Sequence, residues 1–272
     1  MKLQDVKLVI SDMDGTLLNK DDKVSDDFFK LERELRDLGV QFVAASGRQF
    51  YSIQDKLALI KDDIYIVAEN GAYVRHQEEE IMVKHLNMEA CKNFIEIART
   101  IDDAHIVLCG KKHGYVEDKN EDFLEHFKEY YQDYRRVDDL TQVTDDEFLK
   151  VAIYSFGSSR ETTFPAFKKY GENFKVKVSG QNWLDISSLD TDKGSAIAHL
   201  QEILNVRQEE TMVFGDYDND IEMLSRAKYS YAMANASTAV KEVANFETRS
   251  NNERGVETVL EQLLKAKKSI TQ

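Results

Sequence analysis

Two aspartates separated by one residue are the strongest chemical signal in the sequence. Asp12 and Asp14 lie in the segment Asp12-Met13-Asp14-Gly15-Thr16, which closely follows the apolar run Leu8-Val9-Ile10. Because residues i and i+2 of an extended segment point to the same face, the two carboxylates can converge on one ligand. Such a pair can bind a hard cation such as Mg²⁺, or act as nucleophile and general acid. Calcium loops and ordinary turns share the pattern Asp-x-Asp-Gly and are the alternative interpretation.

Two short segments further along the chain predict a site for an anion. Ser46-Gly47-Arg48 ends a predicted strand at residues 42–45, where a hydroxyl and backbone N–H groups can surround a phosphate-sized ion. Lys193 opens a predicted helix, where the helix dipole favours an anion over a cation. A lysine in this position is therefore expected to face a bound anion. An ordinary turn and a solvated surface lysine are the alternative interpretations of these two segments.

A fourth polar segment, Gly215-Asp216-Tyr217-Asp218-Asn219-Asp220, directly follows the apolar residues Met212-Val213-Phe214. It places three carboxylates and one amide in a turn between a predicted strand and a predicted helix. Like charges this close together are costly unless a cation neutralises them. The segment therefore predicts a metal site, with an acidic helix N-terminus as the alternative.

The strands and helices around these four segments determine whether they meet. The first 75 residues alternate between strands, predicted at 6–10, 42–45 and 64–68, and a helix that begins after Ser25 and stops at Gly39. The C-terminal part repeats the alternation, with strands predicted at 211–214 and 229–233, helices at 221–227 and 256–264, and a frayed tail at 265–272. This alternation predicts an α/β fold with a doubly wound (Rossmann-like) parallel sheet. All four segments would then lie at one edge of the sheet, where such proteins bind ligands.

The middle of the chain has a different pattern. The sequence predicts a helix at 89–101 capped by Asn87, short strands at 106–109, 114–116, 150–156 and 183–186, and one apolar helix face from Phe123 to Tyr134. This pattern predicts an α+β domain at 84–187, inserted into a core formed by 1–83 and 188–272. Tyr130, Tyr131 and Tyr134 could stack on a ligand ring, although packing inside the inserted domain is the alternative.

The overall composition excludes several classes of partner. The chain has 36 Lys and Arg against 50 Asp and Glu, a net charge of −14, which disfavours binding to nucleic acid or to an anionic membrane. No apolar run approaches the ~20 residues of a membrane span, and the N-terminus has no signal-peptide pattern. Cys91 and Cys109 form no Cys-x-x-Cys motif and are expected to be buried thiols in a reducing compartment. We expect a cytoplasmic monomer or homodimer.

The four segments, in this order, resemble motifs I to IV of the haloacid dehalogenase superfamily. The domain that follows Asn70-Gly71 is similar to the type IIB cap of the Cof-type phosphatases, and so are the tail segments at 232–236 and 250–256. The resemblance covers nearly the whole chain. Ala234 stands where many relatives have glycine, and Asn252 and Arg254 replace residues that are commonly acidic there.

The resemblance implies a set of roles. Asp12 would attack phosphorus, and Asp14 would protonate the leaving alkoxide and then activate water. Mg²⁺ would be held by Asp12, the Asp14 carbonyl and Asp216, with Asp220 orienting this shell or touching the metal through water. The phosphoryl group would be held by Met13, Ser46, Gly47, Lys193 and Asn219. Possible contacts to the leaving group are Arg48, Asn70 and His113.

The resemblance therefore implies a magnesium-dependent phosphatase that forms an aspartyl-phosphate. Phosphatases and mutases of the superfamily carry aspartate at the position of Asp14, whereas the transport ATPases carry threonine. The expected substrate is a small phosphorylated metabolite, with sugar phosphates first, then flavin mononucleotide or pyridoxal phosphate. Residues 117–147 contain 12 acidic and 4 basic residues, which either keep the protein soluble or disfavour polyanionic substrates. A phosphomutase and a non-catalytic phosphate-binding regulatory protein are the alternatives.

Overall fold

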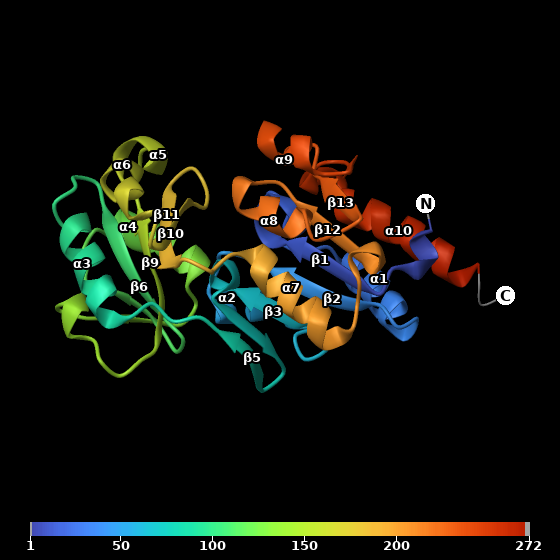
Figure 1. Cartoon of the computed structure of the whole chain (residues 1–272), viewed down its shortest axis with the longest axis horizontal. Coiled ribbons are helices and arrows are strands. Elements are labelled where there is room, and N and C mark those ends of the chain that lie inside the picture. Colours follow the sequence, from blue (N-terminus) through green and yellow to red (C-terminus); the bar gives the residue numbers. More distant parts are fainter. Residues whose placement is uncertain (1, 270–272) are drawn as a thin grey trace.

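Two separate β-sheets organise the computed structural model, which describes residues 2–269 (Figure 1). We call the eight-stranded sheet with its helices the core, and the six-stranded sheet with helices α3 to α6 the cap. The core strands, in spatial order, are β14 (Phe246–Glu247), β13 (Tyr229–Ala232), β12 (Thr211–Gly215), β1 (Leu8–Asp12), β2 (Gln41–Ala45), β3 (Tyr65–Ala68), β4 (Tyr73–His76) and β5 (Glu79–Val83). The cap strands, in spatial order, are β10 (Phe174–Val178), β11 (Trp183–Ser188), β9 (Phe148–Tyr154), β6 (His105–Gly110), β7 (Gly114–Val116) and β8 (Tyr134–Arg136).

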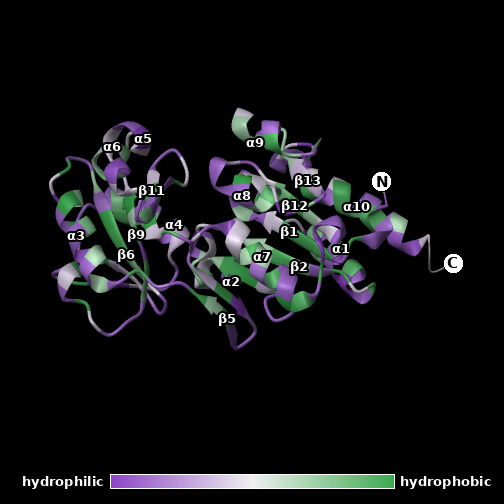
Figure 2. Ribbon diagram, viewed as in Figure 1, coloured by the Kyte–Doolittle hydropathy of each residue, from purple (hydrophilic) through white to green (hydrophobic). Residues whose placement is uncertain are grey.

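The core sheet confirms the predicted doubly wound architecture. Strands β14 to β3 pair in parallel, and β1 lies in the middle with every residue buried. Burial on both faces explains the apolar runs in β1, β2, β3 and β12 (Figure 2). The predicted strand at 6–10 is shifted, because β1 runs from Leu8 to Asp12 and so includes the first aspartate. The antiparallel hairpin of β4 and β5 at the sheet edge was not predicted.

The core helices cover both faces of this sheet. Helix α1 begins after Ser25 as predicted, since the Ser25 hydroxyl accepts a hydrogen bond from the Phe28 N–H at 3.1 Å. The predicted helix at 221–227 is shorter, and the predicted frayed tail is helical as far as Lys268, while residues 270–272 lie outside the described part. The core helices are α1 (Asp26–Asp37), α2 (Phe50–Lys56), α7 (Lys193–Leu204), α8 (Ile221–Leu224), α9 (Thr238–Val243) and α10 (Gly255–Lys268).

The cap is a mainly antiparallel sheet with a hydrophobic cluster on each face. Asn87 caps α3 as predicted, accepting from the Ala90 N–H at 2.8 Å. The single helix face expected from Phe123 to Tyr134 is wrong: α4 ends at Tyr130, and Tyr134 begins strand β8. The cap helices are α3 (Met88–Ala98), α4 (Glu121–Tyr130), α5 (Ser159–Thr162) and α6 (Phe164–Phe167).

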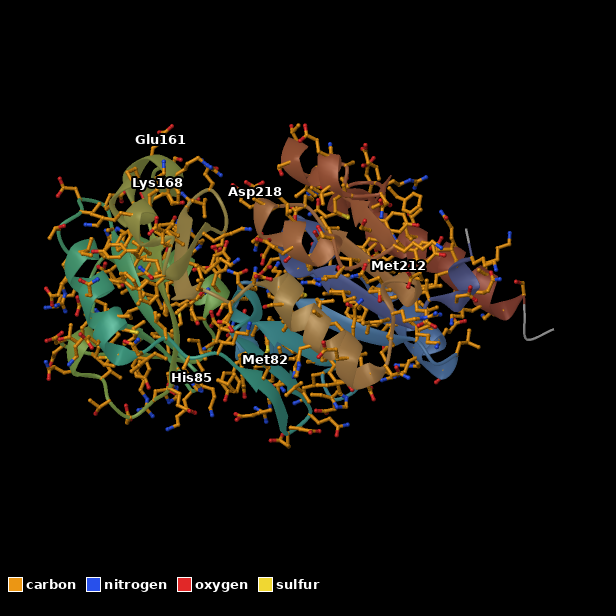
Figure 3. The ribbon with its side chains drawn as sticks, in the orientation of Figure 1. Met82, His85, Glu161, Lys168, Met212 and Asp218 are labelled. Carbon is orange, nitrogen blue, oxygen red and sulfur yellow. The ribbon has the colours of Figure 1, made fainter. Side chains whose placement is uncertain are left out.

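Two connections join the core and the cap. One leads from the end of β5 at Val83 to α3, and Figure 3 labels Met82 and His85 along it. The other leads from the end of β11 at Ser188 to α7. The division at residues 84–187 stays a prediction, and every strand of the cap sheet lies between His105 and Ser188. Within residues 2–269, no helix is both long and apolar enough to cross a membrane.

The contact between α1 and α10 gives a stability prediction. Besides capping α1, the Ser25 hydroxyl donates to Oε1 of the buried Glu257 at 2.5 Å. We expect Ser25→Ala to lower the free energy of unfolding by about 1–2 kcal/mol, measured by urea denaturation, because a cap and a partner of a buried carboxylate are lost together. The control is Ser225→Ala at the exposed C-cap of α8, where the hydroxyl donates to the Ile221 carbonyl at 2.9 Å; equal losses in the two variants would contradict this account.

Candidate active site

Asp12 lies at the carboxyl end of the central strand β1 and faces a buried lysine. The Asp12 residue is 5% exposed, and its Oδ1 lies 2.5 Å from the Nζ of Lys193. The same Nζ lies 2.7 Å from Oδ1 of Asp220, so that one ammonium group bridges two carboxylates. Lys193 is the first residue of α7, and Asp192 caps this helix by accepting from the Ser195 N–H at 2.7 Å. The anions that Lys193 faces here are the side chains of Asp12 and Asp220, and its contact with a bound phosphate stays a prediction.

The cluster formed by Asp12, Asp216, Asp220 and Lys193 contains more acidic than basic groups. Burial and the neighbouring Asp220 raise the pKa of Asp12 well above its usual range, against the lowering effect of Lys193. Burial and Asp220 also raise the pKa of Asp216 to about 7, although Thr16 donates a hydrogen bond to its Oδ1 at 3.0 Å. Burial lowers the pKa of Lys193, but the charges of Asp12 and Asp220 outweigh burial and keep the lysine charged.

The carboxylates of this cluster fit a divalent cation. One oxygen each from Asp12, Asp216 and Asp220 lies within 4.8 Å of the others. Oxygen ligands of this kind suit a hard ion such as Mg²⁺, which would also offset the charge that keeps the pKa of Asp216 high. Asp220 already accepts from the N–H groups of Asp216 at 2.9 Å and Tyr217 at 3.1 Å. Asp220 therefore shapes the loop that presents Asp216.

The turn after β1 brings the acidic segments together. Gly15 has a φ of +73°, and a Cβ at this position would collide with the Asp216 carboxylate. Only glycine combines this backbone conformation with such a close approach. The loop that carries Asp216 begins at the carboxyl end of β12, next to β1, and Figure 3 labels Asp218 in it, at the end of the core that faces the cap.

Asp14 is held by Arg48, which the sequence associated with the leaving group instead. The guanidinium of Arg48 donates to both oxygens of Asp14, at 2.6 Å from Nη2 and 2.9 Å from Nε. It also donates to Asp22 at 2.9 Å and to the carbonyl of Glu129 in the cap at 2.6 Å, and it lies 4.9 Å from the centre of the Tyr130 ring. Arg48 therefore connects Asp14 with the cap.

The other predicted phosphate-binding residues take different positions. Ser46, Gly47 and Asn219 line one cavity together with Asp12, Asp14 and Asp216. Met13 has a buried side chain, and its carbonyl accepts from the Leu18 N–H at 2.8 Å, so that only its backbone faces the turn. Asn70 lies behind this cavity and joins Asn219 to the cap.

The cavity has a volume of about 310 Å³ and lies between the core and the cap. The sequence missed most of its cap wall, which consists of Tyr130, Tyr131, Lys150, Ser179, Gly180, Gln181, Asn182, Trp183 and Asp185. A sequence feature that could have identified Lys150 and Asp185 is that each is one charged residue within an apolar run, Phe148–Tyr154 and Trp183–Ser188 respectively.

Several residues considered from the sequence are not among those that line the cavity: Met13, Asn70, His113, Tyr134, Lys193 and Asp220. The Nδ1 of His113 lies 2.6 Å from Oδ1 of Asp133, and the Tyr134 ring packs edge-on against Phe127 at 5.0 Å. Tyr131 both lines the cavity and stacks on Phe127 at 4.7 Å. The predicted alternative of packing inside the cap therefore holds for Tyr131 and Tyr134.

Comparison with known proteins agrees with this geometry. Residues 9–260 match the family of haloacid dehalogenase-like hydrolases. The chain belongs to this family. It is 30% identical to the 5-amino-6-(5-phospho-D-ribitylamino)uracil phosphatase YbjI of Escherichia coli, over 96% of this chain and 97% of that protein.

Solved structures of this family have the same fold. A crystal structure from Streptococcus mutans, 29% identical, superposes with a TM-score of 0.88 over 96% of this chain and 99% of that chain. A sugar phosphatase of subclass IIB superposes with a TM-score of 0.82 at 21% identity, over 94% of this chain and 98% of that chain. The predicted superfamily, fold and enzyme class, a phosphatase, are confirmed.

The raised pKa of Asp216 predicts a pH-dependent response to Mg²⁺. The folded carboxyl titrates at about 7 rather than at the ordinary 3.8, so the metal-free fold takes up a proton as the pH falls through 7, which stabilises it. Mg²⁺ must displace that proton at low pH. We expect the rise in melting temperature caused by Mg²⁺ to be larger at about pH 8 than at about pH 5.5, measured by differential scanning fluorimetry.

The matched control for this experiment is Asp216→Asn, which removes the titrating group. Its response to Mg²⁺ should be small at both pH values. An equal rise in the wild-type protein at both pH values would contradict the assignment of Asp216 to the cation.

Proposed function

We propose that this phosphatase hydrolyses a small phosphate monoester with Mg²⁺ as its cofactor and Asp12 as its nucleophile. The observation that carries the proposal is the position of Asp12, which lies beside Lys193 and the other carboxylates and opens onto the cavity that also contains Asp14. Asp12, the Asp14 carbonyl and Asp216 would hold the cation. A bound cation would offset the repulsion between the substrate dianion and Asp12 and stabilise charge at phosphorus.

Each protein group then has a defined task in two steps. In the first, a carboxylate oxygen of Asp12 forms a bond to phosphorus, the ester P–O bond breaks, and the Asp14 carboxyl gives its proton to the leaving alkoxide. In the second, water attacks the phosphorus of the aspartyl-phosphate, gives a proton to Asp14, and restores the Asp12 carboxylate with release of phosphate. Arg48 keeps the carboxyl group of Asp14 in place through its two hydrogen bonds.

The cap wall favours a substrate that carries a flat ring. The rings of Tyr130 and Trp183 lie edge to face at 5.5 Å and both line the cavity. Within residues 2–269, the indole Nε1 of Trp183 is buried and has no hydrogen-bond partner. The amide side chain of Gln181 also lines the cavity and could pair with the polar edge of a heterocycle, whereas Nδ2 of Asn182 donates to the backbone carbonyls of Ser155 and Gly157. A buried donor without a partner is costly, so a ring acceptor would stabilise this wall.

We therefore favour a polyol phosphate joined to a nitrogen heterocycle over the simple sugar phosphates that the sequence placed first. The name of the Escherichia coli relative supports this choice, because its substrate is a phosphoribitylamino-uracil. A cavity of about 310 Å³ matches a ligand of this class. Flavin mononucleotide shares the ribityl phosphate and the ring, and pyridoxal phosphate shares only a ring.

The two alternative functions fit the cavity less well. A phosphomutase needs cations for a second phosphate, but both basic residues lining the cavity, Arg48 and Lys150, are already paired with carboxylates. A protein that only binds phosphate has no need for a nucleophile and an acid side by side. A cytoplasmic location and a monomeric or homodimeric state stay predictions.

The nucleophile can be tested by substitution. We expect Asp12→Asn to lower Mg²⁺-dependent phosphate release by at least about a thousandfold on every substrate, because the amide cannot form the aspartyl-phosphate. Phosphate release from a panel that includes the ribitylamino-uracil phosphate, flavin mononucleotide, pyridoxal phosphate and sugar phosphates is the measurement. Asp62→Asn, an exposed aspartate that does not line the cavity, is the control. Release that persists in Asp12→Asn refutes this nucleophile.

The ring-binding wall predicts a change in selectivity. We expect Trp183→Leu to raise KM about tenfold for flavin mononucleotide and the ribitylamino-uracil phosphate, with little change for ribose 5-phosphate, because only the first two place a ring against the indole. Trp183→Phe retains an aromatic face and serves as the matched variant, with a smaller loss. Equal changes in KM for all three substrates would show that Trp183 stabilises the cap without contacting the ring of the substrate.

A further inference from the structure

A chain of three polar side chains runs from the cap to the phosphate-binding side of the cavity. Asp185 of β11 accepts a hydrogen bond from Nδ2 of Asn70 at 2.5 Å. Oδ1 of Asn70 in turn accepts from Nδ2 of Asn219 at 3.0 Å. Asn70 follows β3 and Asn219 follows β12, so that the chain crosses from the cap to the carboxyl ends of two core strands (Figure 1).

The carboxylate at the start of this chain determines the direction of every hydrogen bond in it. An ionised carboxylate only accepts, so Asn70 must turn its NH₂ group towards Asp185. Its oxygen then faces Asn219, which must present its own NH₂ group. An NH₂ group has two N–H donors, and Asn219 uses one of them on Asn70. Its second N–H can then donate to a phosphoryl group in the cavity that Asn219 lines.

A buried cap lysine makes a second connection to the same region. Lys150 is 2% exposed, and its Nζ lies 3.1 Å from Asp185, 2.9 Å from Glu69 and 2.9 Å from the carbonyl of Gly47. Burial alone would lower the pKa of Lys150, but Asp185 and Glu69 outweigh it and keep the lysine charged. Lys150 therefore donates hydrogen bonds to Asp185 and to the Gly47 carbonyl, in the Ser46-Gly47-Arg48 loop, and forms an ion pair with Glu69.

The turn between these contacts has little freedom to adjust. Glu69 and Asn70 both have positive φ values, +53° and +55°, which is uncommon for residues other than glycine. Their N–H groups donate to the carbonyls of Arg48 at 3.1 Å and Ser46 at 3.0 Å. A Cβ on Gly47 would lie 3.0 Å from the Asn70 amide. The Asn70 amide is thus packed directly against the loop that Lys150 also holds.

We propose that Asp185 and Lys150 of the cap are positioning residues for the phosphoryl site, Asp185 acting on Asn219 through Asn70 and Lys150 acting on the Gly47 carbonyl. The proposal rests on the proposed function, in which Ser46, Gly47 and Asn219 hold the transferring phosphoryl group. The docked cap then does more than contact the leaving group, because it also sets the affinity of the core for phosphate itself. Inorganic phosphate, which has no leaving group, is the probe that separates these two effects.

The experiment measures the dissociation constant of inorganic phosphate by calorimetry with Mg²⁺, together with kcat and KM for p-nitrophenyl phosphate. We expect Asp185→Ala and Asn70→Ala each to weaken phosphate binding about tenfold and to raise KM similarly. In the double variant, Asp185→Ala should add little to Asn70→Ala, because the effect of Asp185 on Asn219 passes through Asn70. Additive losses, or phosphate binding unchanged in Asp185→Ala, would overturn the proposal.

A conservative variant separates positioning from simple support of the fold. Asp185→Asn can still accept from Asn70, so its phosphate affinity should stay within about threefold of wild type. It loses the charge that faces Lys150, so its stability to urea should fall as in Asp185→Ala. If phosphate affinity falls together with stability in both variants, Asp185 has only a structural role. Lys177→Met, which breaks the cap–core ion pair with Glu222 at 2.8 Å, should leave phosphate affinity unchanged.

The measurements on the wild-type protein distinguish a failure of this proposal from a failure of the proposed function. Wild-type protein that binds phosphate but hydrolyses no monoester refutes the proposed function and still shows the expected differences in affinity among the variants. Wild-type protein that binds no phosphate refutes both.

Discussion

The burial of carboxylates around one lysine is the constraint on which the rest of the structure depends. Asp12 and Asp220 share the Nζ of Lys193, and Asp216 lies close enough for the three carboxylates to offer oxygens to one ion. A buried charge without a partner is costly, so each element that carries one must be placed accurately. The central position of β1, the glycine turn at Gly15 and the capped start of α7 all serve this placement. The same shortage of positive charge makes the cluster suited to a cation, which would in turn offset the repulsion between these carboxylates and a phosphate dianion.

Two further cations connect this cluster to the cap. Arg48 binds Asp14 on one side and the carbonyl of Glu129 on the other, and Lys150 extends from the cap to Glu69 and the Gly47 carbonyl. Both are buried, so their charges act at low dielectric and their hydrogen bonds fix geometry. The reacting groups of the core and the walls of the cap are therefore parts of one polar network.

The sequence was sufficient to predict the positions of polar residues that follow directly from the local order of strands and helices. Asp12, Lys193 and Asp216 lie at strand ends or helix starts, and alternation of strand and helix brings such positions to one edge. The same pattern could not reveal Lys150 and Asp185, because each is a single charge within an apolar strand and their partners Glu69, Gly47 and Asn70 belong to the core. The hairpin of β4 and β5 was missed because its turn at Gln77 has a positive φ without the usual glycine or asparagine. Helix α4 was predicted too long because Tyr131 still points inward after the helix has ended.

The contacts between the core and the cap are mostly polar, and this has a thermodynamic consequence. Besides Arg48 and Lys150, the side chain of Gln49 pairs with the backbone of Asp133 at 2.7 and 3.1 Å, and Lys177 pairs with Glu222. Surfaces of this kind regain hydrogen bonds from water when they separate, whereas apolar surfaces raise the heat capacity on exposure. Separation of the cap from the core would therefore expose little apolar surface and carry a small heat-capacity change. The balance between the docked and the separated arrangement should vary only gently with temperature, and Leu149 of β9 would leave the core hydrophobic cluster on separation.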